Sequence, residues 1–524
     1  MSTKKYEIVP KEKNHGDWYQ SVLITSDMID YSDVGGCYVL KPLAMSLWEN
    51  IKNDLDSSIR ELGVENCYFP LFVTKSNLEK ESSHFSDFTP EVAWIVTEDP
   101  IAQQKVIADP EIDDALKKLQ AKGLDVHVRT KTTERYAVRP TSETIIYPHF
   151  ASWIKKGGYP KINQWANVVR WENKATQPFI RSREFLWQEG HTCHPTKVSA
   201  VQEVYTVLSI YKNLYERLLA VPMIDGYKTK SETFPGAELT TTIEGFLPDS
   251  GKGIQSATSH YLGQKFSTMF NIKDSNGELV HQNSWGLTTR SIGIMIMTHS
   301  DDRGLVLPPY VAPTQVVLVA CGLNSKTTEQ ERRDVMNSLH TLRDHLVANG
   351  VRAIFDDEEG ESPGMKFNKW EVRGVPLRIE FGPKDFLNDT VVFVRRDRPA
   401  KTKSICAFSS VDHKSTKDYL KEMQEDMLTK AREKVCQNLV YCESYEEVID
   451  ALREKKLTLI DWKDSDDDGK LEEMLKKMCK DNDINSAKIL CIPNKATLDE
   501  IGVKDSRGGF LPNDRKYALF GRSY

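Results

Sequence analysis

Residues 168–191 of the chain read VVRWENKATQPFIRSREFLWQEGH and decide how its N-terminal half folds. Strand-forming residues on either side of a polar, proline-containing connection predict an antiparallel hairpin with strands over 163–172 and 183–190. A second hairpin is predicted over 239–246 and 253–260. The N-terminal half is therefore expected to combine β-hairpins with helices.

Charged side chains cluster on the first hairpin. Alternate residues of a strand share a face, so Arg170 and Glu172 are predicted to project together. Arg181 and Arg183 repeat this alternation on the returning strand. Guanidinium groups bind phosphates through planar, bidentate forks, which indicates an anion site on this sheet. Taken alone, the pattern is more simply explained by cross-strand salt bridges on a solvated face.

Helices are predicted around these hairpins. Apolar residues spaced three or four apart predict a helix over 41–62, and further helices are expected over 142–156 and 288–299. A short strand is predicted over Cys67–Val73. Because Pro70 lacks the donor that a central strand needs, this strand is expected at an edge or an interface.

Two changes of pattern divide the chain. After Leu307–Pro309 the sequence alternates strand, helix and strand, which predicts a small α/β domain. Near residue 412 a long amphipathic helix begins and leads into an acidic segment that ends FGRSY. We therefore expect an α/β protein of three domains, over residues 1–310, 311–412 and 413–524.

Composition limits the classes of function. Hydrophobic residues make up 39% and charged residues 28% of 524 residues, which excludes a wholly disordered or fibrous chain. The net charge of −6 argues against a uniformly basic nucleic-acid coat but allows a basic patch on one domain. Nine cysteines without a C-x-x-C pair suit a reducing compartment. Since we find neither a secretory signal nor an apolar run of membrane length, we expect a cytoplasmic protein without a membrane partner.

Residues 286–293, GLTTRSIG, hold a second candidate anion site. They place Arg290 in the first turn of a predicted helix, where a cation opposes the helix dipole by about 0.3–1 kcal/mol. A bound anion between the guanidinium and the helix N-terminus would remove that conflict. An arginine that turns into solvent fits this segment equally well.

Two further segments carry polar candidates. In RPTSET, Thr141 can cap the following helix and Glu143 lies in its first turn, so capping alone is the simpler interpretation. The alternative is that Glu143 receives a substrate ammonium group. In QSATSH, Thr258 and His260 share a strand face, and Gln255 joins them only across a bulge or a strand end. This strand fits a ligand site and a plain polar sheet face equally well.

Together these segments resemble class II aminoacyl-tRNA synthetases, specifically prolyl-tRNA synthetases of the eukaryotic and archaeal type. The matching strings are RPTSET, VVRWE, RSREFLWQEGH, TTTIE, GIQSATSHYLGQ, SWGLTTRSIG and the terminal GRSY, and the resemblance covers nearly the whole chain. It implies a catalytic α+β domain with an antiparallel sheet flanked by helices, a small α/β anticodon-binding domain and a C-terminal α+β domain. It also implies a homodimer whose interface contains the 41–62 helix and the strand ending at Pro70.

The resemblance also assigns residues to two substrates. The residues expected to contact L-proline are Thr141, Glu143, Arg170, Trp187, Glu189 and His260. The residues expected to contact ATP are Arg170, Glu172, Arg181, Ser182, Gln255, Thr258, Thr288 and Arg290, with Mg²⁺ held through ATP near Gln255. The implied enzyme is a proline–tRNA ligase that forms prolyl-adenylate and pyrophosphate and then transfers prolyl to the 3′ end of tRNA(Pro). Arg170 and Arg290 are its expected catalytic residues, because the reaction needs positioning and electrostatic stabilisation rather than a nucleophilic side chain.

Two departures from the family affect these expectations. The family often binds zinc in its last domain through four cysteines, but the stretches near 460–470 and 500–515 contain none, so we expect no zinc. The bacterial-type editing insertion is also missing between His191 and Thr240. Because a pocket separates near-isosteres by only about 1–3 kcal/mol, we expect side activation of cysteine. The metal-like strings DSDDDG and HTCH lack further ligands.

Charge in the second domain is polarised. Residues 366–403 carry ten Lys and Arg against five Asp and Glu, whereas Asp356–Glu361 carries five acids. A basic stripe facing tRNA phosphates would give this pattern, and so would two solvated faces. A synthetase for another amino acid and a non-catalytic paralogue are the rival interpretations. The presence of Arg170, Arg181 and Arg290 argues against the paralogue.

Overall fold

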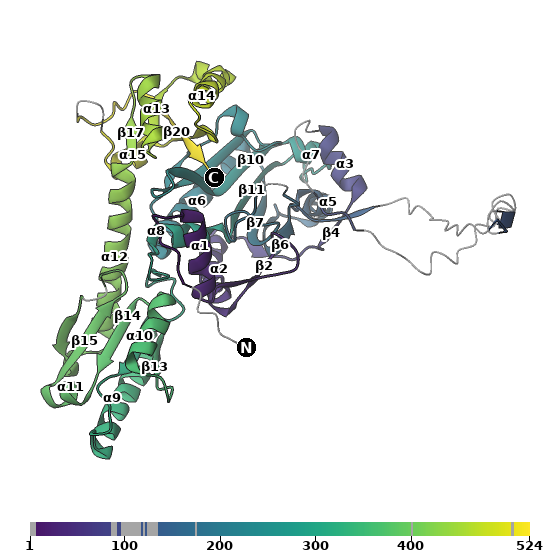
Figure 1. The fold of residues 1–524 in the computed structure, drawn as a ribbon. Coiled ribbons are helices and arrows are strands. Elements are labelled where there is room, and N and C mark those ends of the chain that lie inside the picture. Colours follow the sequence, from purple (N-terminus) through teal and green to yellow (C-terminus); the bar gives the residue numbers. More distant parts are fainter. Residues whose placement is uncertain are drawn as a thin grey trace.

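The computed structural model describes residues 7–84, 92–95, 117–118, 121–122, 135–172, 175–399, 402–504 and 508–524. A large mixed α/β body adjoins the long helix α12, His413–Gln437. A five-stranded module lies at one end of α12 and the C-terminal helices lie at the other (Figure 1). No helix within these described ranges is long and apolar enough to cross a membrane.

An 11-stranded sheet organises the large body, in the order β17-β18-β20-β19-β8-β9-β10-β11-β7-β6-β3. Its central strands are β6 (Lys161–Val169), β7 (Glu184–His194), β8 (Ile224–Tyr227), β9 (Leu239–Leu247), β10 (Lys252–Gly263) and β11 (His281–Thr288). From β8 to β6 every neighbouring pair is antiparallel. Both predicted hairpins, β6–β7 and β9–β10, are therefore confirmed, as is the antiparallel sheet.

Helices pack around the central strands. One hydrophobic core joins them to α1 (His15–Thr25), α2 (Pro42–Arg60), α6 (Lys197–Asn213) and α8 (Arg290–His299). The apolar stripe predicted for residues 41–62 is buried on α2. A second core contains side chains of α5 (Glu143–Trp153) and α7 (Lys265–Met269). The sheet is thus flanked by helices, as expected.

The predicted strand Cys67–Val73 is wrong in extent. The chain forms two short strands instead, β3 (Glu65–Asn66) at the edge of the large sheet and β4 (Phe72–Thr74), which pairs with β5 (Tyr136–Val138). Between β3 and β4 the Phe69 amide donates to the side chain of Gln164 rather than to a strand. Pro70 has no amide hydrogen to continue pairing, so the chain leaves the sheet there, and the expected edge position is confirmed. Helix α3 (Lys75–His84) follows β4, and a separate two-stranded sheet contains β1 (Ile29–Tyr31) and β2 (Tyr38–Leu40).

The second part of the chain forms a five-stranded sheet with helices, as the strand–helix–strand pattern predicts. Its strands are β12 (Val316–Ala320), β13 (Ala353–Asp356), β14 (Leu377–Phe381), β15 (Thr390–Arg395) and β16 (Ser404–Ala407). Its helices are α9 (Glu329–Ala348), α10 (Pro363–Val372) and α11 (Pro383–Asn388). Arg396 of this module pairs with Asp301 at 2.6 Å, which ties the module to the large body.

The C-terminal segment adds its strands to the large sheet. They are β17 (Leu439–Tyr441), β18 (Leu457–Trp462), β19 (Ala487–Pro493) and β20 (Lys516–Ser523), with helices α13 (Tyr445–Arg453), α14 (Lys470–Asp481) and α15 (Lys495–Ile501). A buried ion pair supports the junction: Lys228 Nζ lies 2.6 Å from Glu244 Oε1 and also donates to the carbonyl of Leu490. Strand β20 also pairs with β10, so the last residues of the chain lie beside the central strands.

Candidate active site

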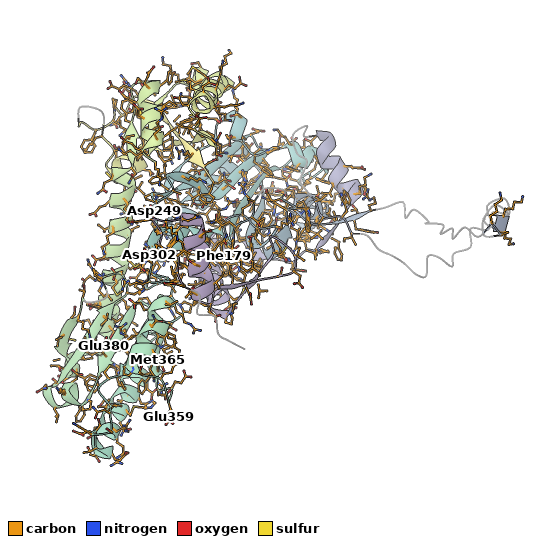
Figure 2. All side chains as sticks on the ribbon, in the orientation of Figure 1. Phe179, Asp249, Asp302, Glu359, Met365 and Glu380 are labelled. Atoms are coloured by element: carbon orange, nitrogen blue, oxygen red, sulfur yellow. The ribbon has the colours of Figure 1, made fainter. Side chains whose placement is uncertain are left out.

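A cavity of about 540 Å³ lies in the large body. Every residue predicted to contact proline or ATP lines it, namely Thr141, Glu143, Arg170, Glu172, Arg181, Ser182, Trp187, Glu189, Gln255, Thr258, His260, Thr288 and Arg290. Phe179, another lining residue, is labelled in Figure 2; it lies in the large body, apart from Met365 and Glu380 of the five-stranded module. The four segments singled out in the sequence thus converge on one site.

The connection between β6 and β7 differs from the predicted strands. Because β6 ends at Val169 and β7 begins at Glu184, Arg170, Glu172 and Arg181 lie in the connection, and strand alternation does not bring them together. A bridge between Gln177 and Arg181 and the left-handed backbone of Phe179, with a φ of 61°, fold the connection back on itself. The predicted salt-bridge ladder is therefore wrong.

Arg183 does not join the other predicted arginines. Its guanidinium stacks on the Trp171 ring at 4.7 Å and donates to the carbonyl oxygens of Gly35 and Glu172. It is not among the residues that line the cavity. The arginines of the cavity are Arg170 and Arg181 from the connection and Arg290 from α8.

One end of the cavity holds two buried carboxylates near a guanidinium. Glu143 is 4% exposed and accepts a hydrogen bond from the Thr141 hydroxyl. The predicted cap at Thr141 is wrong, because Ser142 is the N-cap residue of α5 and its side chain makes no capping hydrogen bond. Glu189 is 2% exposed and lies on β7 beside the pocket. Arg170 is held by a 3.1 Å bond from Nε to the Pro140 carbonyl, and its guanidinium lies 5.6 Å from the Trp187 ring. This end can receive a small zwitterion, with separate partners for its ammonium and its carboxylate.

Glu189 is held by a buried polar network. Ser142 and Gln164 both donate to Oε1, the latter at 2.7 Å. His191 Nε2 lies 3.1 Å from Oε2, and the Tyr147 hydroxyl lies 3.0 Å from His191 Nδ1. His191 also lines the pocket but was not predicted there, although its alternation with Trp187 and Glu189 on one strand is a signal for it.

His260 closes the pocket beside Phe234. Their ring centroids lie 4.8 Å apart, and His260 Nδ1 lies 3.0 Å from the Thr240 hydroxyl. Burial and the nearby His191 lower the pKa of His260 to about 3, so the ring is neutral at physiological pH. Phe234 belongs to an irregular segment without hydrophobic periodicity, and nothing in the sequence pattern pointed to it.

The other end of the cavity is built around Arg290 and a β-bulge. Arg290 is the first residue of α8, as predicted; Nε donates to the Ile180 carbonyl and Nη1 to the Gln255 carbonyl, both at 3.0 Å. The pairing of β10 with β9 shifts between Gln255 and Ala257, which confirms the bulge that Gln255 needs to join the cavity. A helix N-terminus together with Arg290 and Arg181 suits a polyanion.

The chain terminus lies beside this end. Arg181 Nη2 donates to the Tyr524 carbonyl oxygen at 3.3 Å, and the Tyr524 amide donates to the Gly253 carbonyl at 3.1 Å. A second cavity of about 210 Å³ is lined by Tyr524, Arg181, Gln255 and Arg290, among others. Tyr524 therefore lies beside the Arg290 end of the site.

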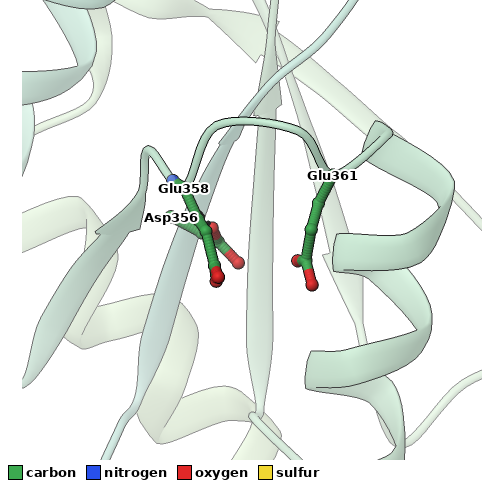
Figure 3. Close-up of side chains that lie close together, drawn as sticks. All are labelled: Asp356, Glu358 and Glu361. Carbon is green, nitrogen blue, oxygen red and sulfur yellow. Dashed lines mark hydrogen bonds between the residues drawn. The ribbon is translucent and has the colours of Figure 1, made fainter.

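The polarised charges of the second domain face each other. Among the described residues, Asp356, Glu358 and Glu361 form the one cluster close enough to share a metal ion (Figure 3). Lys369 Nζ already lies 3.4, 2.8 and 3.5 Å from these three carboxylates. Lys366 adds a further contact to Asp356 at 3.1 Å. An ammonium group thus takes the place of a metal there.

The predicted basic stripe is neutralised elsewhere too. Arg395 pairs with Asp397 at 2.9 Å and with Asp426 of α12 at 2.7 Å. Arg398 also contacts Asp426, at 2.6 Å. Much of the stripe's charge is thus paired within the protein, so tRNA phosphates would compete with these carboxylates, and the phosphate-facing stripe stays a prediction. The same ion pairs exclude two purely solvated faces.

Comparison with known proteins agrees with this site. The family model of the class II tRNA synthetase core domain (G, H, P, S and T) matches residues 126–299, and that of the anticodon binding domain matches residues 315–423. The proline–tRNA ligase of Encephalitozoon cuniculi is 41% identical, over 100% of both chains. The cytoplasmic proline–tRNA ligase of Arabidopsis thaliana is 41% identical, over 98% of this chain and 90% of its own length.

Longer relatives and solved structures match as well. The bifunctional glutamate/proline–tRNA ligase of Mus musculus is 41% identical over 98% of this chain, which spans 33% of that protein's length. The crystal structure of prolyl-tRNA synthetase from Cryptosporidium parvum, complexed with L-proline and AMP, superposes with a TM-score of 0.81 and 38% identity. That match covers 98% of this chain and 99% of the other. This chain therefore belongs to the proline–tRNA ligase family of class II aminoacyl-tRNA synthetases.

Proposed function

We propose that this protein activates L-proline with ATP, giving prolyl-adenylate and pyrophosphate, and transfers the prolyl group to tRNA(Pro). The observation that carries the proposal is a single cavity with buried carboxylates beside Arg170 at one end and Arg290 on a helix N-terminus at the other. A relative that matches along its full length is named proline–tRNA ligase. The Cryptosporidium enzyme binds L-proline and AMP.

At the amino-acid end, the zwitterion is held from both sides. Glu143 receives the secondary ammonium, Trp187 and Phe234 border the ring, and Arg170 binds the carboxylate. Arg170 also binds the α-phosphate and so holds the attacking oxygen against phosphorus. Positioning of this kind can supply much of the rate acceleration without a nucleophilic side chain.

At the nucleotide end, Glu172 binds adenine, while Arg181, Ser182, Thr258 and Thr288 bind the sugar and phosphates. Arg290 stabilises the charge that builds up on the departing pyrophosphate. Oxygen ligands for Mg²⁺ are available near Gln255: Glu244 lies opposite it on β9, and its buried Oε2 has no hydrogen-bond partner among the described residues. The ion, bound with ATP, would neutralise phosphate charge.

The complete reaction is tested by charging tRNA. Purified protein, ATP and Mg²⁺ are expected to attach labelled proline to tRNA(Pro) but not to a tRNA with another anticodon. Failure to charge tRNA(Pro), with proline activation intact, would contradict the second step alone.

The domains divide this work. Residues 1–310 form the catalytic domain, residues 311–412 the domain that recognises the anticodon, and residues 413–524 the C-terminal domain. The cytoplasmic naming of the Arabidopsis relative supports a cytoplasmic location.

We also propose that the protein is a homodimer. Large apolar side chains are exposed where the chain passes from β3 to β4: Tyr68 is 73% and Phe72 57% exposed. Two more exposed aromatic residues lie close by, Tyr136 on β5 and Trp94, which is bridged to Ala137 of β5. Such a cluster fits a second copy of the chain. Light scattering is expected to give about twice the 59.8 kDa chain mass, and Phe72→Glu should shift the protein towards monomer. A monomeric wild-type protein at micromolar concentration would contradict the proposal.

Cysteine is expected to be activated as a side reaction. It is close to proline in size, and such near-isosteres are separated by only about 1–3 kcal/mol, or roughly 10–200-fold. Cysteine-dependent ATP–pyrophosphate exchange should therefore exceed the rate without amino acid, although it should remain far below the rate with proline. Alanine, which fills less of the pocket, serves as the comparison. Exchange with cysteine at background level would show that the pocket excludes it.

A further inference from the structure

The β-bulge that brings Gln255 into the cavity is held by hydrogen bonds from side chains rather than by the neighbouring strand β11. Gln255 lies opposite Glu244 and Ala257 lies opposite Ile243, so Ser256 is the extra residue of β10. On its other side, β10 pairs with β11 from Ala257 onward and not at Gln255 or Ser256. The carbonyl groups at the bulge therefore need donors from outside the sheet.

Two side chains supply those donors. Arg290 Nη1 donates to the Gln255 carbonyl at 3.0 Å, and the Tyr215 hydroxyl donates to the Ser256 carbonyl at 3.1 Å. Tyr215 is fully buried, and this burial raises the pKa of its hydroxyl, so it remains a protonated donor. The bulge is thus held by two side chains: Arg290, which is assigned to ATP, and Tyr215, which does not line the cavity.

Tyr215 comes from an equally unusual element. It lies in a π-helical turn, Leu214–Leu218, that continues α6. Such turns are rare, insert an extra residue into a helix and frequently occur at functional sites. Here the widened turn and the β-bulge are joined by the hydrogen bond between Tyr215 and Ser256.

We propose that Tyr215 is a positioning residue for the nucleotide: by holding the Ser256 carbonyl, it fixes the bulge that presents Gln255 to ATP and Mg²⁺. This inference rests on the proposed function, because it uses the nucleotide role of Gln255. Tyr215 then affects the affinity for ATP and Mg²⁺ and leaves the affinity for proline unchanged. The proline end is built mainly around α5 and β7, and its one residue on β10, His260, lies further along that strand, beyond the bulge.

The chain offers a matched control. Tyr211, on the same helical face one turn earlier, is also fully buried, and its hydroxyl donates to Gln188 Oε1 at 2.7 Å. Gln188 in turn donates to Asn163 Oδ1 at 2.8 Å, and neither residue lines the cavity. Tyr211→Phe therefore removes the same group from an equally buried position without touching the bulge.

The experiment compares Tyr215→Phe, Tyr211→Phe and Gln255→Ala with the wild type in proline-dependent ATP–pyrophosphate exchange. Tyr215→Phe is expected to raise the KM for ATP by about five- to tenfold, because it removes one buried hydrogen bond that holds the bulge. It should also shift activation to higher Mg²⁺ concentration and leave the KM for proline within twofold. Tyr211→Phe should change none of these, even if its Tm falls equally. Equal KM values for ATP in the two tyrosine variants would overturn the proposal.

Two further results separate the possible failures. If Gln255→Ala leaves the KM for ATP unchanged, the assigned role of Gln255 is wrong, whatever Tyr215 does. If the wild type shows no exchange, the dissociation constant of ATP with Mg²⁺, measured by calorimetry, still tests Tyr215→Phe against Tyr211→Phe. Partial unfolding lowers the active fraction but not the affinity of folded molecules. Tyr215→Met replaces Tyr215→Phe if the latter cannot be purified.

Discussion

Arg170→Ala is expected to lower the rate of proline-dependent ATP–pyrophosphate exchange by at least about 10³-fold. Arg170 lies close enough to Glu143, Glu189 and Glu172 to interact with all three carboxylates, which places it between the two ends of the cavity. On the roles proposed above, its loss would remove a contact to both substrates at once. Because Arg170 is proposed to hold the attacking carboxylate against the α-phosphate, kcat should fall as well as the affinities.

The control for this prediction is Arg183→Ala on the same connection. Arg183 stacks on Trp171 outside the cavity, so exchange should fall by no more than a few fold. Circular dichroism and thermal unfolding would check that both variants remain folded. An Arg170→Ala protein with near-normal exchange would refute the role assigned to Arg170. A similar loss in both variants would indicate damage to the connection rather than to catalysis.

Glu143→Gln should reduce kcat/KM for proline by about two orders of magnitude, because a buried ammonium would lose its ionic partner. The change keeps the shape of the side chain, and the Thr141 hydroxyl can still donate to the new amide oxygen. Steady-state exchange at varied proline and fixed ATP measures the effect. The KM for ATP should change by no more than twofold.

Glu172→Gln provides the opposite comparison. Glu172 lines the same cavity but is assigned to adenine, so its variant should raise the KM for ATP and spare proline. If Glu143→Gln affects mainly proline and Glu172→Gln mainly ATP, the assignment of one end of the cavity to each substrate is supported. Equal effects of Glu143→Gln on both substrates would contradict it.

Local patterns were sufficient for much of the fold and the site. Strand alternation and turn residues predicted both hairpins, and the parity of Gln255 predicted the bulge on β10. Every residue assigned through the resemblance lines one cavity. The hairpins and the bulge share a cause, since each is encoded within a few residues of its own segment, whereas the set of site residues came from the family resemblance.

The errors involve partners that are distant in sequence or backbone conformations without a clear signal. The positive φ at Phe179 and the irregular connection moved Arg183 out of the site. The charge pattern of residues 366–403 did not reveal that Arg395 on β15 pairs with Asp426 on α12. Tyr215 reaches Ser256 only after α6 is packed against β10, and no local pattern records that contact.

The most direct test of the account is ATP–pyrophosphate exchange with each of the twenty amino acids separately. The account predicts strong exchange with proline, weak exchange with cysteine and background rates with the others. No exchange with proline, or faster exchange with another amino acid such as threonine or glycine, would contradict it.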